Sequence, residues 1–143
     1  MSTKSNIRDS LPPAGPVNEV SGLALRGYDP VAYAMDHRAE PGRAEIFHIL
    51  DGVTYRFTSA RHRDDFVADP QRYLPQYGGY CALAAAEGQK ADADPTAFAI
   101  VDGKLYLNYD KDVQADWGGD VVGNVAKADA NWPTTSALGE VER

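Results

Sequence analysis

The 143-residue sequence contains one cysteine, Cys81, and it has no Cys-x-x-Cys or His-x-His spacing. A single cysteine cannot close an internal disulfide, so a disulfide-stabilised secreted fold is excluded. The missing spacings also remove the usual sequence evidence for a metal centre built from neighbouring ligands. A chemical role for Cys81 would involve a free thiol, alone or with partners that are distant in sequence.

Clusters of positive charge are also missing. The formal net charge is −7, and the isoelectric point is near 4.8. The tightest basic group, Arg61-His62-Arg63, is followed at once by Asp64 and Asp65. A protein that binds nucleic-acid phosphates needs a basic face, so neither nucleic acid nor an anionic membrane is an expected partner.

Long apolar runs are absent as well. No stretch approaches the roughly 20 apolar residues of a membrane-spanning helix. The first residues, MSTKSNIRDS, lack the apolar region of a signal peptide, which favours a cytoplasmic location. The chain length, with 43% hydrophobic and 24% charged residues, is typical of one globular domain. The sequence gives no indication of an oligomeric state.

The most distinctive stretch that is present runs from Gln76 to Gln89 and reads QYGGYCALAAAEGQ. Gly78-Gly79 permits a tight turn, and Ala82 to Glu87 are predicted to form a helix. This places Cys81 in the first helical turn, where unpaired N–H groups and the helix dipole favour a thiolate. We therefore expect a pKa below the ordinary value of about 8.5. The alternative is that Cys81 is a small apolar core residue.

Apolar periodicity and turn signals predict helices alternating with two β-hairpins. In the first hairpin, a turn at Asp51-Gly52 would pair Leu50 with Val53, His48 with Tyr55 and Ile46 with Phe57. The other expected elements are a helix over 31–38 begun by Asp29-Pro30, a Ser59-capped helix to Ala68, a linker over 71–76, a second hairpin over 97–109, a helix from Asp110 to Trp117, and a partly helical stretch over 120–132.

Several residues recur at one fixed interval. Phe98, Ile100, Asp102, Gly103 and Tyr106 each follow an identical residue by 51 positions. This periodicity predicts an α+β fold of two helix–hairpin–helix modules, over about 28–70 and 77–120, around one core. The domain would span 22–133, between an N-terminal arm (1–21) and a peripheral tail (134–143).

Four segments together resemble the YHS-domain family: GLALRGYDPVAY (22–33), DGVTYRFTSARHRDDFVADPQRYLPQYGGYCA (51–82), DPTAFAIVDGKLYLNY (94–109) and ADANWP (128–133). The resemblance implies a small α+β unit related to treble-clef modules. It also implies a metal ion as ligand, with copper and zinc the candidates.

The metal-ligand positions of that family are mostly changed in this chain. Where metal-binding relatives have cysteines, this sequence has Ala32, Thr58 and His62. Alanine cannot ligate, and threonine is a poor ligand for soft or borderline metals. The chain instead resembles the subfamily with the YGGYCA segment, so we expect no structural zinc.

The leading functional hypothesis is a small binding protein with a pocket around Cys81, for a metal ion or a thiol-reactive ligand. Its predicted lining is Cys81, Tyr77, Gly78, Gly79 and Tyr80, and its candidate metal ligands are Cys81, His62 and His48.

Two alternatives stay open. One is an enzyme that uses Cys81 as a redox or nucleophilic thiol. The other is a protein-interaction module whose metal site has decayed. No nucleophile elbow or phosphate-binding loop motif points to a hydrolase or nucleotide-binding enzyme.

Overall fold

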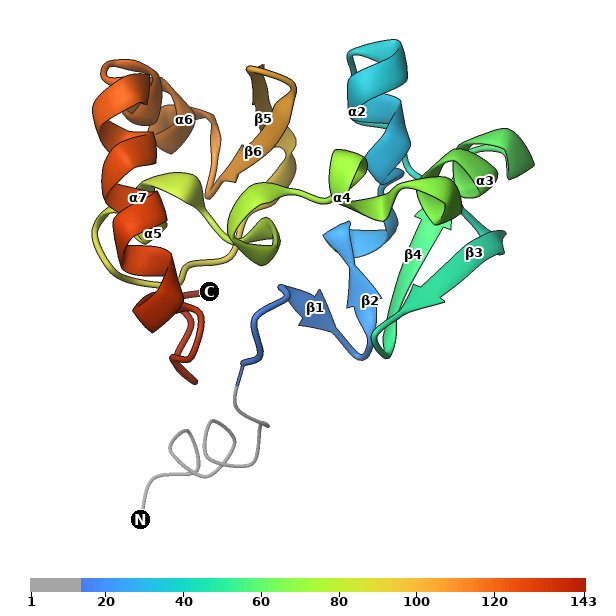
Figure 1. The fold of residues 1–143 in the computed structure, drawn as a ribbon, viewed down its shortest axis with the longest axis horizontal. Coiled ribbons are helices and arrows are strands. Elements are labelled where there is room, and N and C mark those ends of the chain that lie inside the picture. The colour runs from blue at the N-terminus through green and yellow to red at the C-terminus, as the bar shows by residue number, and fades with distance from the viewer. Residues whose placement is uncertain (1–13) are drawn as a thin grey trace.

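The computed structural model describes residues 14–143. It shows a mixed α+β fold with two small sheets in which most strand pairs are antiparallel. Figure 1 shows two halves that lie side by side. The first half carries the strands labelled β1 to β4 with helices α2 to α4, and the second carries β5 and β6 with α5 to α7. The α+β class expected from the sequence is therefore confirmed.

The first half is built on a four-stranded sheet in the order β1-β2-β4-β3. β2 runs parallel to β4, and the other two pairings are antiparallel. Its elements are β1 (Glu19–Val20), β2 (Leu23–Ala24), the 3₁₀ turn η1 (Leu25–Gly27), α2 (Pro30–Asp36), β3 (Arg43–Leu50), β4 (Val53–Phe57), α3 (Ala60–Ala68) and α4 (Pro70–Tyr73).

The second half contains a single hairpin with helices packed against it. Its elements are the 3₁₀ turn η2 (Gln76–Gly79), α5 (Ala82–Ala86), β5 (Asp94–Val101), β6 (Lys104–Asn108), α6 (Lys111–Gly118) and α7 (Val121–Thr135). Side-chain caps begin its two longer helices, because Asp110 accepts from the Val113 N–H and Asp120 from the Gly123 N–H.

Both hairpins close through a two-residue turn with positive φ at Asp51-Gly52 and at Asp102-Gly103, as a type I′ turn requires. Near the first turn the predicted pairs Leu50–Val53 and His48–Tyr55 are present. The predicted Ile46–Phe57 pair is wrong, because a register shift between Arg43 and Phe47 makes Arg43 the partner of Phe57. A turn fixes only the pairs next to it, and extra residues in one strand change the rest.

The second hairpin has the same register 51 residues later. Phe98 pairs with Leu107 as Phe47 pairs with Arg56, and a register shift also precedes Phe98. The strands of the two hairpins have the same lengths, and the helix that follows each is capped by a side chain at Ser59 or Asp110.

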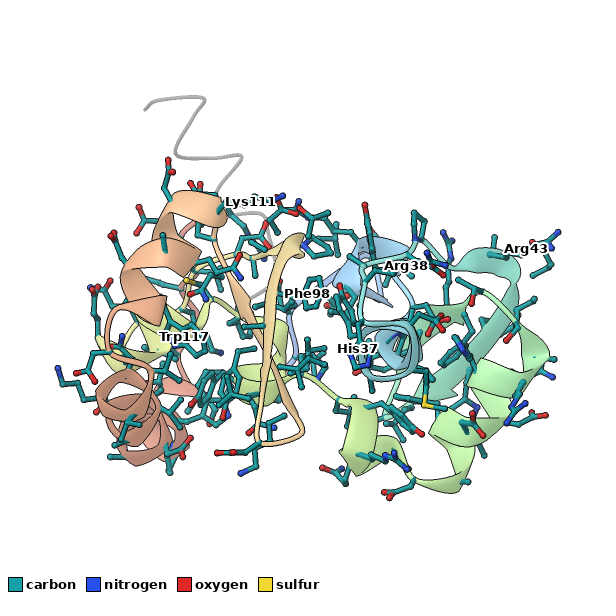
Figure 2. The ribbon with its side chains drawn as sticks, turned by 90° about the horizontal axis from the view of Figure 1, so that it is seen from above. His37, Arg38, Arg43, Phe98, Lys111 and Trp117 are labelled. Atoms are coloured by element: carbon teal, nitrogen blue, oxygen red, sulfur yellow. The ribbon has the colours of Figure 1, made fainter. Side chains whose placement is uncertain are left out.

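The hydrophobic core crosses the boundary between the halves. Leu105 and Leu107 of β6 belong to the same buried cluster as Phe57 and Phe66 of the first half. Figure 2 shows Phe98 between the halves, and its ring meets Tyr33 of α2 edge-on, with 4.9 Å between centroids. A second cluster, around Trp117, Tyr106 and four buried alanines, lies within the second half.

Several connecting and terminal segments are more ordered than the sequence predicts. Residues 1–13 of the predicted arm lie outside the described part of the chain, whereas Glu19–Val20 forms β1. The predicted linker over 71–76 is largely helical, in α4 and the start of η2. Helix α7 continues through Pro133 to Thr135. The largely exposed tail is attached to the segment before β5, because the Glu142 N–H donates to Lys90 O and Glu142 O accepts from the Asp92 N–H.

Lys90 fixes both ends of the described chain to the second half. Its side chain is buried, and Nζ donates to the carbonyl oxygens of Gly15, Ser136 and Leu138 at 2.7–2.9 Å. The ammonium also lies 5.0 Å from the ring centroid of Tyr80, within the usual range of a cation–π contact. Burial lowers the pKa of Lys90.

Candidate functional site

Cys81 is the residue that begins helix α5. It occupies the N-cap position rather than the first turn, and it is 2% exposed. Its backbone N–H donates to Ala91 O at 2.9 Å, and its thiol lies 3.5 Å from Oδ1 of the fully buried Asn108. The same Asn108 oxygen accepts from the Leu83 N–H, while Asn108 Nδ2 has no partner among the described residues.

The environment of the thiol favours its neutral form. Burial raises the pKa of Cys81, and hydrogen bonding from the backbone of Ala84, Tyr109 and Leu83 opposes that effect without cancelling it. The predicted lowering of the pKa is therefore wrong. Removing the sulfur from water penalises its charged form more than three partial positive charges stabilise it.

Cys81 nevertheless lies on the wall of a shallow depression of about 290 Å³. Side chains from three segments surround it, including Leu83 of α5, Val113 of α6 and Tyr109 between β6 and α6. Glu87 and Glu142 add acidic groups to the lining, and no histidine among the described residues belongs to it. A small ligand in this depression would therefore meet the sulfur beside mixed apolar and acidic groups.

The two glycines before Cys81 form a turn that contacts the segment before β1. A Cβ at Gly78 would lie 1.8 Å from Pro16 O, and the Asn18 N–H donates to Gly78 O at 2.8 Å. Gly78 and Gly79 both have positive φ, which side-chained residues adopt at a cost. They allow the backbone of residues 16–18 to lie against this turn.

Tyr77 and Tyr80 do not line the depression with Cys81. The Tyr77 hydroxyl donates to Asp129 Oδ1 at 2.9 Å, and the Tyr80 hydroxyl donates to Gly15 O at 2.8 Å. Burial raises the pKa of both phenols, and at Tyr77 the bond to Asp129 adds to the effect. Tyr77 and Gly78 instead line a separate cavity of about 580 Å³. The predicted five-residue pocket is therefore not formed, because Gly79 lines a third, smaller pocket and Tyr80 lines neither the depression nor the larger cavity.

The first half contains a buried hydrogen-bond network around Asp29, for which the sequence predicted only a helix cap. Asp29 is fully buried. One of its oxygens accepts from the Val31 and Ala32 N–H groups. The other accepts from the N–H and hydroxyl of Thr58 at 2.8 and 2.9 Å, and it lies 2.7 Å from His62 Nδ1.

This network brings together Ala32, Thr58 and His62, the three positions at which the YHS resemblance would imply cysteine ligands. Ala32, Thr58 and His62 all meet at the Asp29 carboxylate. The Asp-Pro and Ser-x-x-His spacings suggested caps, and no signal in the sequence indicated that the two segments would share one carboxylate. His62 Nε2 lies 3.9 Å from Asp36 Oδ2, the nearest further acid.

The candidate metal ligands are not assembled around one point. His62 belongs to the Asp29 network. His48 pairs with Tyr55 in the first hairpin, and its ring lies 6.3 Å from that of Phe66, so its surroundings are those of a half-buried packing residue. Within residues 14–143 no three His, Cys, Asp or Glu side chains form a group that could hold a metal ion.

Comparisons with known proteins returned no match. No family model, no curated protein and no solved structure matches the chain. The YHS resemblance therefore stays a proposal that rests on the four sequence segments. Among the residues that the structure describes, no helix is long and apolar enough to cross a membrane.

Proposed function

We propose that this chain is a small YHS-like binding protein that takes a thiol-reactive ligand at Cys81. The observation that carries the proposal is the position of the sulfur, on the wall of a 290 Å³ depression and at the start of a helix. The depression gives a small molecule a place to rest against the Leu83, Tyr109 and Val113 side chains before it meets the thiol.

The contacts around Cys81 parallel those around Asp29, and this supports two copies of one module. The Asp29 N–H donates to Glu40 O as the Cys81 N–H donates to Ala91 O. Each residue begins a helix directly after a 3₁₀ turn with positive φ.

The backbone groups that serve the two side chains also correspond. Asp29 accepts from the N–H groups of Val31, Ala32 and Thr58. Around Cys81, backbone hydrogen bonds from Leu83, Ala84 and Tyr109 act to lower the pKa of the thiol. These residues lie 51 or 52 positions after Val31, Ala32 and Thr58. The N-cap that holds a carboxylate in the first module therefore holds a thiol in the second.

A ligand with its own electrophilic centre fits these surroundings better than a metal ion held by several protein groups. No histidine lies in the lining, and the described residues offer no group of three donors. Because the thiolate is the reactive form and burial raises the pKa of Cys81, the reaction should be slow near neutrality and should accelerate as the pH rises.

Alkylation of the native protein tests the proposal. Iodoacetamide, followed by intact mass, should add one label to folded wild-type protein and none to Cys81→Ser. The rate should keep rising above pH 8.5, whereas the same thiol in urea-unfolded protein should approach its plateau sooner. If the folded protein is labelled only as fast as it globally unfolds, Cys81 is a core residue and the proposal fails.

Cys81→Asp tests the proposed correspondence of the two modules separately. An aspartate at this N-cap would meet the backbone groups that serve the Asp29 carboxylate, so the variant should stay folded, with unfolding free energy within about 1–2 kcal/mol of Cys81→Ser. Ala82→Asp is the matched control, because Ala82 is also fully buried but follows the cap. It should lose several kcal/mol, as burial of an unpaired charge does. Equal losses in both variants would contradict the correspondence.

One observation favours a second candidate, an interaction module without a metal. Hydrogen bonds of 2.7–3.2 Å join Asp29, Thr58 and His62, and the last two stand at positions where the resemblance implies cysteines. Such a network can stabilise the first half without a metal. Retention of the far-UV circular dichroism of purified protein in EDTA would agree with it, and loss of that signal together with stoichiometric zinc would contradict it.

A further inference from the structure

A second cavity of the described chain lies away from Cys81. It has a volume of about 580 Å³ and receives residues from the segment before β1, from the first hairpin, from the turn around Tyr77 and from α7. This volume is within the range of about 300–1,000 Å³ of small-molecule sites. Cys81 is not among its lining residues, so the cavity is independent of the proposed thiol function.

The charged groups in the lining are all acidic. Asp51, from the first hairpin turn, and Asp129, from α7, both belong to it, whereas no Lys, Arg or His among the described residues does. One Asp129 oxygen accepts from the Tyr77 hydroxyl, so it remains fixed at the cavity wall. The chain as a whole carries a net charge of −7, which adds to the attraction for a cation.

Aromatic and apolar side chains complete the lining. Tyr55, Tyr77 and Trp132 contribute rings, and Leu25 and Leu74 contribute aliphatic surface. The faces of tyrosine and tryptophan rings attract cations, and their area also binds apolar groups. The cavity therefore offers both kinds of surface that an organic cation needs.

Tyr55 supplies a hydrogen-bonding group that the protein does not use. The residue is 3% exposed and lines the cavity. No hydrogen bond joins its hydroxyl to another described residue, and the oxygen is not one of their buried unpaired polar atoms, so it is open to the cavity. Burial, and secondarily the charge of Asp51, raise the pKa of this phenol to about 12. The hydroxyl thus keeps its proton at physiological pH and can pair with a polar group of a ligand.

We infer that this cavity binds a small organic amine, with its ammonium group toward the Asp51 and Asp129 carboxylates and its apolar body against Tyr55, Tyr77 and Trp132. A carboxylate or phosphate ligand would meet two acids and no cationic side chain, so the electrostatics select against it. A neutral ligand of the same shape would retain the apolar contacts and lose the charge pairing.

Isothermal titration calorimetry on the full chain, with phenethylamine as the probe, tests this inference. Phenethylamine should bind with a submillimolar Kd, whereas the neutral 2-phenylethanol should bind at least about tenfold more weakly and phenylacetate should not bind. The affinity for phenethylamine should fall as sodium chloride is raised, because salt screens the carboxylates.

A matched pair of variants locates the site. Asp51→Asn should weaken phenethylamine about tenfold, and it should fold normally because asparagine suits a type I′ turn. Asp102→Asn changes the corresponding turn of the second hairpin, which is not part of the cavity lining, and it should leave the affinity unchanged. Tyr55→Phe should weaken binding by a smaller factor, since only the hydroxyl is removed.

Three results would overturn the inference: no measurable binding of phenethylamine up to about 10 mM, equal affinity for 2-phenylethanol, or the same loss of affinity in Asp102→Asn as in Asp51→Asn. The first would show that the cavity takes no amine. The second would assign it to apolar ligands, and the third would show only a diffuse attraction to the acidic chain. Cys81→Ser should bind phenethylamine like wild type, so these results do not depend on the thiol proposal.

Discussion

Replacement of Lys90 by methionine should destabilise the fold more than the same replacement of an exposed lysine. Its ammonium donates all three of its hydrogen bonds to carbonyl oxygens, those of Gly15, Ser136 and Leu138. These carbonyls belong to the two ends of the described chain, which also meet directly where the Ala14 N–H donates to Gly139 O. Methionine keeps an unbranched stem of similar length and removes the charge and the three donors.

The magnitude follows from a gain and an opposing cost. Hydrogen bonds to charged groups contribute about 1.5–3 kcal/mol each, so three give about 4.5–9 kcal/mol. Burying the ammonium costs several kcal/mol, and burial lowers the pKa of Lys90 for the same reason. After the mutation, water can reach some of the freed carbonyls, because Leu138 is 40% exposed. We expect a net loss of about 2–4 kcal/mol.

Urea unfolding at pH 7, followed by circular dichroism, measures this loss. The Lys90→Met midpoint should fall, with little change in the dependence of unfolding free energy on urea. Lys104→Met is the control, since Lys104 is exposed in the second hairpin, and surface changes usually stay within about 0.5 kcal/mol. A Lys90→Met protein within about 0.5 kcal/mol of wild type would show that the three hydrogen bonds only balance the cost of burial.

Two further predictions concern the segment before β1. By urea unfolding, Gly78→Ala should destabilise the protein by at least about 1 kcal/mol more than Gly103→Ala. Both glycines have positive φ, but only a side chain at Gly78 would place a Cβ against Pro16 O. Equal losses in the two variants would refute a tight backbone contact at Gly78. At Asp92, burial raises the pKa, but hydrogen bonds from Asn18, Ala93 and Arg26 outweigh it and leave the pKa below its reference of 3.8. Its contribution to stability is therefore complete above the pKa of the unfolded chain and is lost as the pH falls through the lower folded value. Asp92→Asn should flatten the fall in stability between about pH 5 and pH 2, and a profile parallel to that of wild type would contradict the assignment.

Local sequence signals predicted the hairpins and most helix starts correctly. The turn at Asp51-Gly52 and the caps at Asp29, Ser59 and Asp110 depend on residues within three or four positions of one another. Such signals act through local backbone preferences and short hydrogen bonds. The Ile46–Phe57 pair was wrong because a register shift farther from the turn has no local signature.

The repeated module and the YHS resemblance both stay proposals. The equal hairpin registers 51 residues apart and the parallel contacts of Asp29 and Cys81 support a repeated module. Matching residues could indicate that two segments are alike. They could not indicate that the first module's N-cap would hold a carboxylate bonded to Thr58 and His62.

The sequence by itself determined the α+β class, the unpaired thiol and the acidic balance of the chain. Only the tertiary structure decided what surrounds each of these groups. Cys81 has a raised pKa because distant residues remove it from water, and its neighbours Tyr77 and Gly78 face a different cavity because residues 16–18 and α7 pack on that side. Solvation and long-range contacts depend on where the chain returns in space, whereas propensity and spacing along the chain report only on near neighbours.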